Sequence, residues 1–176
     1  DRSGQRIATV DTLVIAAAQH SKSFRPISFL PLSSLLGQIS LIPENENSSR
    51  LKTSIVNKGY LIPSIDGFHV VGSTYSRGGF DENQWPQTVT VAGHKKNYDM
   101  LDLELRSLFP ACKFDQWLGY SAIRSATPDR LPVVGPVPEA KKFKKDFERL
   151  SHGPRGKFPT GVDYHPNLFV LAGLGS

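Results

Sequence analysis

Arg124 is the side chain in this sequence whose surroundings most favour a binding role. It stands just before a Thr-Pro-Asp turn and a short apolar run that ends at Gly135. Pro128 and Pro132 fix the backbone and remove N–H donors, so the segment after the arginine is stiff and cannot continue a helix. Binding side chains are common on such rigid loops. A surface arginine beside a proline-rich turn is the alternative interpretation.

Two tyrosines and a second arginine can also meet a ligand. Tyr60 and Tyr75 lie in a segment rich in strand-forming residues, where their hydroxyls can face a substrate or their rings can simply pack. Arg77 and Trp85 share a polar loop that contains two glycines. A guanidinium and an indole in one loop suit stacking on a base, although Trp85, placed before a proline, can equally cap the core.

Other kinds of site find little support. Cys112 is the single cysteine, which excludes an internal disulfide and a thiolate metal cluster and favours a half-buried structural thiol. The five histidines show no ligand spacing and no paired carboxylate, so we predict no metal. No Gly-x-Gly-x-x-Gly and no Gly-x-Ser-x-Gly motif occurs, although a Ser-His-Asp arrangement stays open.

Charge points to a polyanionic partner. With 21 basic and 16 acidic residues the net charge is +5. The segment 141–150 predicts a helix with Phe143, Phe147 and Leu150 on one face and cations mostly on the other. Clustered cations of this kind can contact RNA phosphates, and a solvated helix face is the alternative. The candidate RNA-binding residues are Lys141, Lys142, Lys144 and Lys145.

The surrounding pattern predicts an α+β fold with a largely antiparallel sheet and helices on one face. Residues 59–75 read as a hairpin around an Asp-Gly turn, and residues 36–42 and 167–176 as strands. Residues 7–18 predict a strand whose apolar run is buried on both faces, as in a parallel sheet. Residues 97–109 predict one amphipathic helix with three leucines on one stripe. No apolar run is long enough for a bilayer, so we expect no membrane partner and a cytoplasmic location.

Residues 123–138 resemble the Arg-x-x-Thr-x-Asp-x-x-Pro-x-x-Gly signature of the FAD-dependent amine and amino-acid oxidases related to glycine and sarcosine oxidase. The resemblance implies that Arg124 meets the substrate carboxylate beside the flavin. It also implies that Tyr60, Tyr75 and Arg77 contact the substrate. Further matching strings, in order along the chain, are residues 37–43, 59–63, 71–78 and 171–176.

The same resemblance implies FAD as the cofactor. Ala18 stands where the family has glycine, and Leu36 replaces an arginine. The implied flanks belong to a Rossmann-like α/β FAD-binding domain, with residues 1–25 as its end, 26–120 as the substrate domain and 121–176 as return strands. The main pyrophosphate motif is absent from the sequence. The cofactor-binding residues carried over are Ala17, Gly37, Gln38, Gly173, Gly175 and Ser176.

Within the family, the strings are most similar to the oxidase part of bifunctional bacterial enzymes that modify the tRNA wobble uridine. This similarity implies that carboxymethylaminomethyl uridine loses its carboxymethyl group as glyoxylate, before a separate domain methylates the amine with S-adenosylmethionine. We therefore expect an internal piece of a longer polypeptide, with tRNA as partner. A free amino-acid oxidase explains the motifs alone, and a noncatalytic RNA-binding module explains only the charge.

Overall fold

The computed structural model of the protein describes residues 3–110, 112–153 and 157–175. The chain divides into two compact units, which we call unit 1 (Asp1–Ser33 and Arg124–Ser176) and unit 2 (Ser34–Ile123). The predicted domain bounds, after residues 25 and 120, stay a prediction, and the two compact units divide after residues 33 and 123. The segments before and after unit 2 form one body, which Arg124 belongs to.

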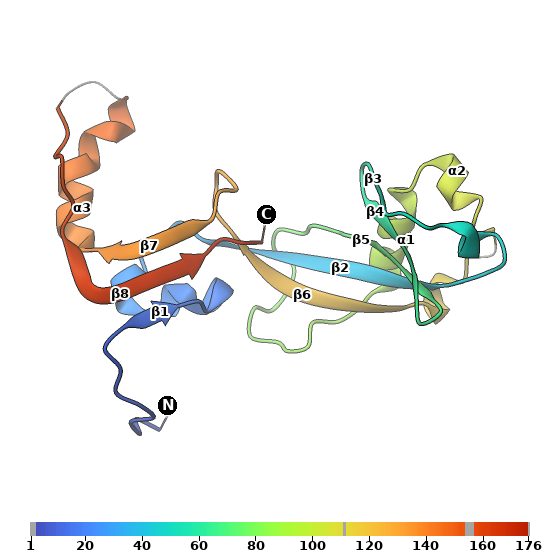
Figure 1. The fold of residues 1–176 in the computed structure, drawn as a ribbon, viewed down its shortest axis with the longest axis horizontal. Helices are drawn as coiled ribbons and strands as arrows, with labels where there is room; N and C mark the ends of the chain where they lie inside the picture. The colour runs from blue at the N-terminus through green and yellow to red at the C-terminus, as the bar shows by residue number, and fades with distance from the viewer. Residues whose placement is uncertain (1–2, 111, 154–156, 176) are drawn as a thin grey trace. The chain divides into compact units, whose positions relative to one another are not determined.

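Unit 1 is built on a three-stranded sheet in the order β1-β8-β7 (Figure 1). The strands are β1 (Leu13–Ile15), β7 (Val133–Pro138) and β8 (Tyr164–Ala172). β1 pairs with β8 in parallel and β7 pairs with β8 antiparallel. Ile15 and Val170 turn toward a core that also contains Ile27, Leu30 and Val137.

The predicted burial of β1 on both faces is wrong for the described chain. Leu13 and Val14 are 50% and 55% exposed, and only Ile15 is buried. β1 is an edge strand in the observed order, and the core covers one face of its sheet. An edge strand with one covered face buries only part of its side chains, however continuous its apolar run.

Helix α3 (Ala140–Phe147) also belongs to unit 1, and a 3₁₀ turn follows it over Glu148–His152. The helix begins where the Glu139 carboxylate accepts a hydrogen bond from the backbone N–H of Lys142, 2.9 Å away. The helix predicted over residues 141–150 is confirmed up to Phe147. Leu150 does not share the buried face, because 3₁₀ geometry changes the angular spacing of the residues after Phe147.

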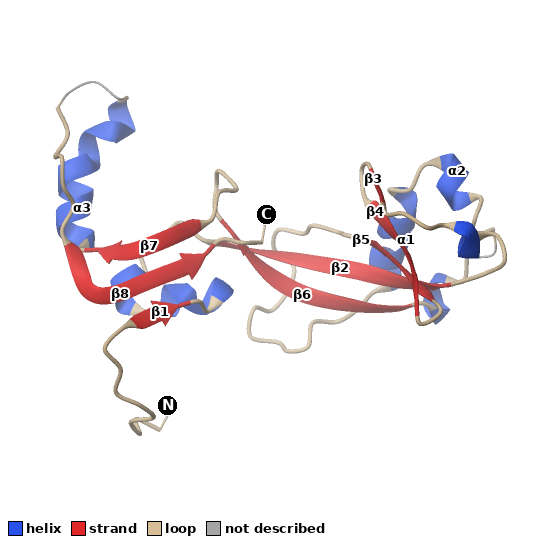
Figure 2. Ribbon diagram, in the orientation of Figure 1, coloured by secondary structure: helices blue, strands red, loops and turns tan. Residues whose placement is uncertain are grey.

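Unit 2 contains a five-stranded sheet in the order β3-β4-β5-β2-β6 (Figure 2). The strands are β2 (Ser33–Pro43), β3 (Ile55–Val56), β4 (Tyr60–Ile65), β5 (Phe68–Gly72) and β6 (Leu118–Ala126). The β3–β4, β4–β5 and β2–β5 pairs are antiparallel, as predicted. Asp66 and Gly67, at φ 52° and 82°, form the two-residue turn of the predicted hairpin.

One face of this sheet is covered and its residues alternate accordingly. Gln38, Ser40 and Ile42 of β2 are buried, as are Leu61 and Val71 of the neighbouring strands. Helices α1 (Val91–Asp99) and α2 (Leu103–Arg106) and a 3₁₀ turn at Phe114–Gln116 belong to the same unit. The core of unit 2 is made of Ile42, Leu61, Val71, Leu101, Phe109 and Trp117.

The single helix predicted over residues 97–109 is wrong, because the chain breaks between α1 and α2. Asp102 is extended and precedes α2 as its N-cap residue. Arg106 reaches back with its Nε to the carbonyl of Leu101, 2.7 Å away, and also donates to the carbonyl of Asp99. Carbonyls freed at the end of α1 are thereby satisfied by a side chain instead of by further helix. The three leucines of the predicted stripe still pack in or against the core of unit 2.

Candidate functional site

A cavity of about 270 Å³ lies in unit 1, where the ends of β1, β6 and β8 meet. Most of its wall consists of alanine, glycine and serine, with two leucines, and Arg124 is the one charged residue among its described lining residues. The described lining residues are Ala16, Ala18, Arg124, Ser125, Leu171, Ala172, Gly173, Leu174 and Gly175. The sequence-predicted residues Arg124, Gly173 and Gly175 are therefore brought together, whereas Ala17 packs against the core of unit 1.

The turn after β6 is held by the threonine and the aspartate of the arginine signature. The Thr127 hydroxyl donates to the carbonyl of Leu131 over 2.7 Å, and the Asp129 carboxylate accepts from the Leu131 N–H over 3.1 Å. The bond from Leu131 is the main cause that lowers the pKa of Asp129 below its usual value. Threonine and aspartate thus shape the loop behind the half-buried Arg124.

Glycine is required at two places in the cavity wall. A Cβ on Gly175 would stand 2.6 Å from the Cβ of Arg124 and 2.8 Å from the carbonyl oxygen of Ser125, to which the Gly175 N–H donates over 2.9 Å. Gly173 has φ +75°, and a Cβ there would lie 2.8 Å from Thr127. Larger residues would close the cavity or displace Arg124.

Ala18 occupies a backbone position that suits glycine. It has φ 47°, in the left-handed region that L-residues rarely adopt, and it lines the cavity together with Ala16. The resemblance expects a glycine here, and the backbone geometry supplies the physical reason. The alanine is accommodated with some strain.

These residues fit the ring portion of a flavin better than the whole dinucleotide. The cavity is slightly smaller than the roughly 300 Å³ at which typical ligand pockets begin. The alanine and glycine residues of its wall allow a flat ring to approach closely, and the Arg124 guanidinium suits a carboxylate. Nothing in the lining offers the backbone cradle that a diphosphate needs. Ser176, also predicted to bind the cofactor, lies outside the described residues.

The two other residues predicted to bind the cofactor, Gly37 and Gln38, belong to unit 2 and are both buried. The Gln38 side-chain nitrogen donates to the carbonyl of Thr90 over 2.9 Å, and its oxygen accepts from the Thr90 N–H over 2.8 Å. Thr90 is the N-cap of α1 and accepts from the N–H of Gly93. Gln38 therefore ties the helix to the sheet, and its contact with a cofactor stays a prediction.

The predicted substrate-binding residues Tyr60, Tyr75 and Arg77 also lie in unit 2. Tyr60 is half-buried in β4 opposite Gly72, whereas Tyr75 and Arg77 are exposed beyond the end of β5. Trp85 is 80% exposed and therefore does not cap the core, which removes that alternative. The Cys112 thiol is half-buried and donates to the carbonyl of Phe109 over 3.0 Å, in a structural role.

A buried polar cluster in unit 2 escaped the sequence analysis. The Ser40 hydroxyl lies 2.8 Å from Nδ1 of His94, and the Asn97 amide donates to Ser40 and to the Gln38 carbonyl. Burial lowers the pKa of His94. Ser40 is completely buried, so this pair has no access to a substrate and fixes α1 on the sheet. The one sequence signal for this cluster is the three-residue spacing of His94 and Asn97, which places both side chains on the same face of a helix.

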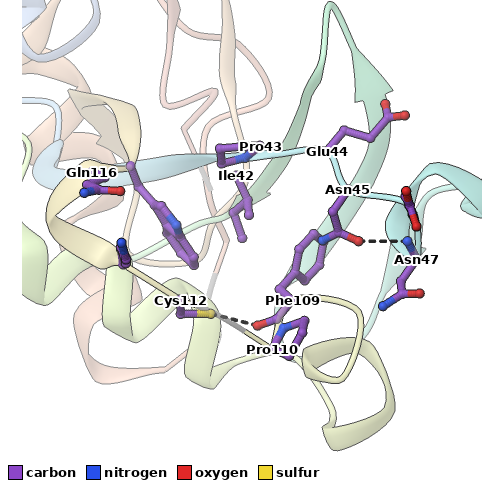
Figure 3. Close-up of a pocket in the computed structure, with 12 residues that line it drawn as sticks. Ile42, Pro43, Glu44, Asn45, Asn47, Phe109, Pro110, Cys112 and Gln116 are labelled. Carbon is purple, nitrogen blue, oxygen red and sulfur yellow. Dashed lines mark hydrogen bonds between the residues drawn. The ribbon is translucent and has the colours of Figure 1, made fainter.

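A second cavity, of about 580 Å³, lies within unit 2 (Figure 3). Its floor is apolar, with Ile42, Phe109 and Trp117. Glu44, Glu46 and Lys113 line it beside several amides. Two carboxylates against one ammonium give the lining a net negative charge, which disfavours an anionic ligand.

Among residues 3–110, 112–153 and 157–175, no helix is both long and apolar enough to cross a membrane. No group of three or more histidine, cysteine, aspartate or glutamate residues is placed to hold a metal ion in that part of the chain.

The family model for FAD-dependent oxidoreductases (DAO) matches residues 1–176. The chain belongs to this family. Its relatives include proteins called tRNA 5-methylaminomethyl-2-thiouridine biosynthesis bifunctional protein MnmC. That of Leptospira borgpetersenii is 34% identical over 161 residues, covering 89% of this chain and 23% of the relative. That of Pseudomonas putida is 30% identical over 177 residues, covering 98% and 26%. The chain thus spans about a quarter of the length of these relatives.

Solved structures of oxidases share the fold of this FAD-dependent oxidoreductase chain. Glycine oxidase from Bacillus cereus matches with a TM-score of 0.59 at 15% identity, covering 97% of this chain and 39% of that one. Iminodiacetate oxidase from Chelativorans matches with a TM-score of 0.58 at 17% identity, covering 98% and 39%. At these identities the likeness concerns the fold, and it agrees with the predicted α+β class.

Proposed function

We propose that this chain is part of an FAD-dependent oxidase that removes the carboxymethyl group from carboxymethylaminomethyl uridine at the tRNA wobble position. The products would be aminomethyl uridine and glyoxylate, and a separate domain that binds S-adenosylmethionine would then methylate the amine. Support comes from the family of the chain and from the printed names of its relatives. A soluble, cytoplasmic setting is part of the same proposal.

The observation that carries the proposal is the single guanidinium in a cavity of small residues. The reacting fragment of the substrate is an N-substituted glycine, which has one carboxylate and one adjacent carbon to be oxidised. Arg124 would hold the carboxylate through charge-assisted hydrogen bonds, each worth roughly 1.5–3 kcal/mol. The wall at Gly173 and Gly175 would leave room for the flat ring next to it.

Orientation matters more than binding strength in this arrangement. Fixing the carboxylate on Arg124 fixes the neighbouring carbon, and correct placement of reacting atoms can supply several kcal/mol of the barrier. The stiff turn from Thr127 to Leu131 supports this placement, because it limits movement of the chain that follows Arg124. A bound flavin would supply the acceptor for the hydride from that carbon.

Further contacts are proposed from the predicted residues of both units. In unit 2, Tyr60, Tyr75 and Arg77 would contribute to substrate binding, and Gly37 and Gln38 to cofactor binding. In unit 1, Ala17, Gly173, Gly175 and Ser176 would contribute to cofactor binding. The other contacts that bind the cofactor would come from the rest of the polypeptide.

A free amino-acid oxidase is the second candidate. The Arg124 guanidinium suits the carboxylate of free glycine as well as that of the tRNA fragment. Anaerobic mixing of the full-length protein with substrate separates the two candidates, because reduction bleaches the visible absorption of flavin. Bleaching by carboxymethylaminomethyl tRNA and not by glycine supports the tRNA oxidase. Bleaching by glycine alone overturns it.

A further inference from the structure

The net positive charge of the chain is confined to unit 1. This unit holds 13 basic and seven acidic residues, whereas unit 2 holds eight basic and nine acidic residues. The net charges are therefore +6 and −1. A polyanion attracted to this chain is attracted to unit 1.

Helix α3 carries the densest part of that charge, and aromatic contacts fix which of its faces points inward. The ring of Phe143 lies 6.5 Å from that of Phe29 and 4.8 Å from that of Phe147. Phe147 in turn stacks on Phe158 at 6.1 Å. Because Phe143 and Phe147 are four residues apart, they define one inner stripe of the helix.

The opposite face is a ridge of cations. Lys141 and Lys145 lie four residues apart on the outer face of α3, and Arg149 follows in the 3₁₀ turn after the helix. All three side chains are exposed. Within the described part of the chain, no ion pair involves any of these three. We call these residues the basic ridge.

The two other lysines of α3, Lys142 and Lys144, interact with residues of unit 1. The Lys142 ammonium lies 2.9 Å from the Asp163 carboxylate and 3.5 Å from that of Asp146, and this pairing raises the pKa of Lys142. Lys144 lies over the ring of Phe29, 5.8 Å from its centre. The four lysines are therefore not equivalent, although their types and spacing look uniform in the sequence.

The basic ridge has an energetic cost that an anion would relieve. Like charges four residues apart on a helix, as Lys141 and Lys145 are, repel each other and destabilise it. The dipole of α3 favours cations only near its C-terminal end, so it does not offset the charge of Lys141 in the first turn. A row of phosphates along the ridge would remove this repulsion.

We propose that the basic ridge of α3 docks the phosphate backbone of a structured RNA. This inference rests on the proposed function, in which tRNA is the substrate. Since α3 and Arg124 belong to the same unit, RNA held on the ridge is held by the body that also carries the candidate carboxylate site. The ridge would contribute affinity, and Arg124 would select the reacting fragment.

An anionic membrane is the competing polyanion, and the packing of α3 disfavours it. A helix that binds a membrane inserts its apolar face between the lipids. The apolar residues of α3, Phe143 and Phe147, already pack on Phe29 and Phe158. The outer face of α3 therefore presents charged side chains, which do not insert between lipids.

The test measures tRNA binding by the full-length protein between 50 and 200 mM salt. The variant Lys141→Ala/Lys145→Ala removes two ridge cations. We expect about tenfold weaker binding and a slope of log K against log salt that is smaller by about 1.5, since each lost phosphate contact lowers the slope by about 0.7–0.9. The matched control, Lys58→Ala/Lys96→Ala, removes two exposed lysines of unit 2 and should leave the slope unchanged.

The outcomes separate the docking proposal from the proposed tRNA substrate. If the ridge variant leaves the salt slope unchanged, or if the control variant weakens tRNA binding equally, the docking proposal is overturned while tRNA binding itself stays intact. If the unaltered protein shows no salt-dependent tRNA binding, the proposed tRNA substrate fails instead. Lys142→Ala should change the slope less than Lys145→Ala does, and the reverse order contradicts the assignment. Loss of binding to phosphatidylserine vesicles without loss of tRNA binding would establish a membrane surface in its place.

Discussion

Unit 1 and unit 2 use their polar residues in opposite ways. In unit 2 the polar side chains of β2 and α1 are buried and bond to one another, as Gln38 does with Thr90 and Ser40 with His94. In unit 1 the half-buried Arg124 lines a cavity together with alanine, glycine and leucine residues, and Lys141 and Lys145 of α3 are exposed. Satisfied buried groups stabilise a scaffold, whereas cations that line a cavity or stand on the surface can meet ligands.

The charge difference supports the same division. Unit 1 has a net charge of +6 and unit 2 of −1, and the lining of the cavity in unit 2 has a net negative charge. The larger positive potential for anionic parts of a substrate is therefore expected at unit 1. Unit 2 provides a stable sheet and, by proposal, the tyrosines that face the substrate.

Removal of the cation from the cavity should have the largest effect. Arg124→Ala in the full-length protein should lower kcat/KM about 10- to 150-fold, the equivalent of a lost charge-assisted hydrogen bond of about 1.5–3 kcal/mol. Arg124→Lys should recover only part of the rate, because lysine lacks the planar fork that holds a carboxylate at two points. Steady-state oxygen consumption measures both, and unaltered kinetics would rule out the carboxylate assignment.

Filling the cavity wall should have the next largest effect. Gly175→Ala places a Cβ 2.6 Å from that of Arg124, and relief of such overpacking typically costs about 1–3 kcal/mol. We expect a loss of kcat/KM of about 5- to 150-fold. Gly161→Ala is the matched control in the same unit, since no atom lies within 4 Å of the added Cβ. Equal kinetics of the two variants would show that the wall is not part of the site.

Acid should destabilise unit 2. Burial lowers the pKa of His94 from its usual 6.5 in the folded state, so the unfolded state binds a proton first as the pH falls. Neutral His94 contributes fully to the free energy of unfolding above pH 6.5, and this contribution is lost as the pH falls toward the lower pKa of the folded state. The equilibrium constant for opening should rise by at most about tenfold per pH unit. Hydrogen exchange of peptides from residues 34–123, corrected for intrinsic rates, measures this. Protection that stays constant down to pH 5 contradicts it.

The smallest expected effect concerns Ala18. Its left-handed backbone costs about 1–2 kcal/mol relative to an ordinary conformation, whereas glycine adopts it freely but loses more entropy on folding. Ala18→Gly should therefore raise the free energy of unfolding by up to about 1 kcal/mol, measured by denaturant unfolding of the full-length protein. A lower stability of this variant would mean that the alanine is not strained.

Local features could be predicted from the sequence because neighbouring residues determine them. The hairpin around Asp66 and Gly67 needs only positive φ at two adjacent positions. The Arg124 loop likewise depends on Thr127 and Asp129, which lie within five residues of the arginine. Such features can be predicted without knowing any tertiary contact.

Other features depend on contacts between distant residues and were not predictable. Gln38 is bound by Thr90, which lies 52 residues further along the chain. The break between α1 and α2 relies on Arg106 bonding back to Leu101, and helical periodicity alone does not reveal it. The exposure of Val14 depends on which face of its sheet the core covers.

The central claim is that unit 1 uses two separate groups of cations, one for the carboxylate and one for RNA. The most direct test is anaerobic flavin bleaching in the full-length protein by two substrates, modified tRNA and the free carboxymethylaminomethyl uridine nucleoside. We predict that Arg124→Ala slows bleaching by both, whereas Lys141→Ala/Lys145→Ala slows it with subsaturating tRNA alone. Equal slowing of both substrates by the ridge variant, or bleaching unaffected by Arg124→Ala, would contradict the account.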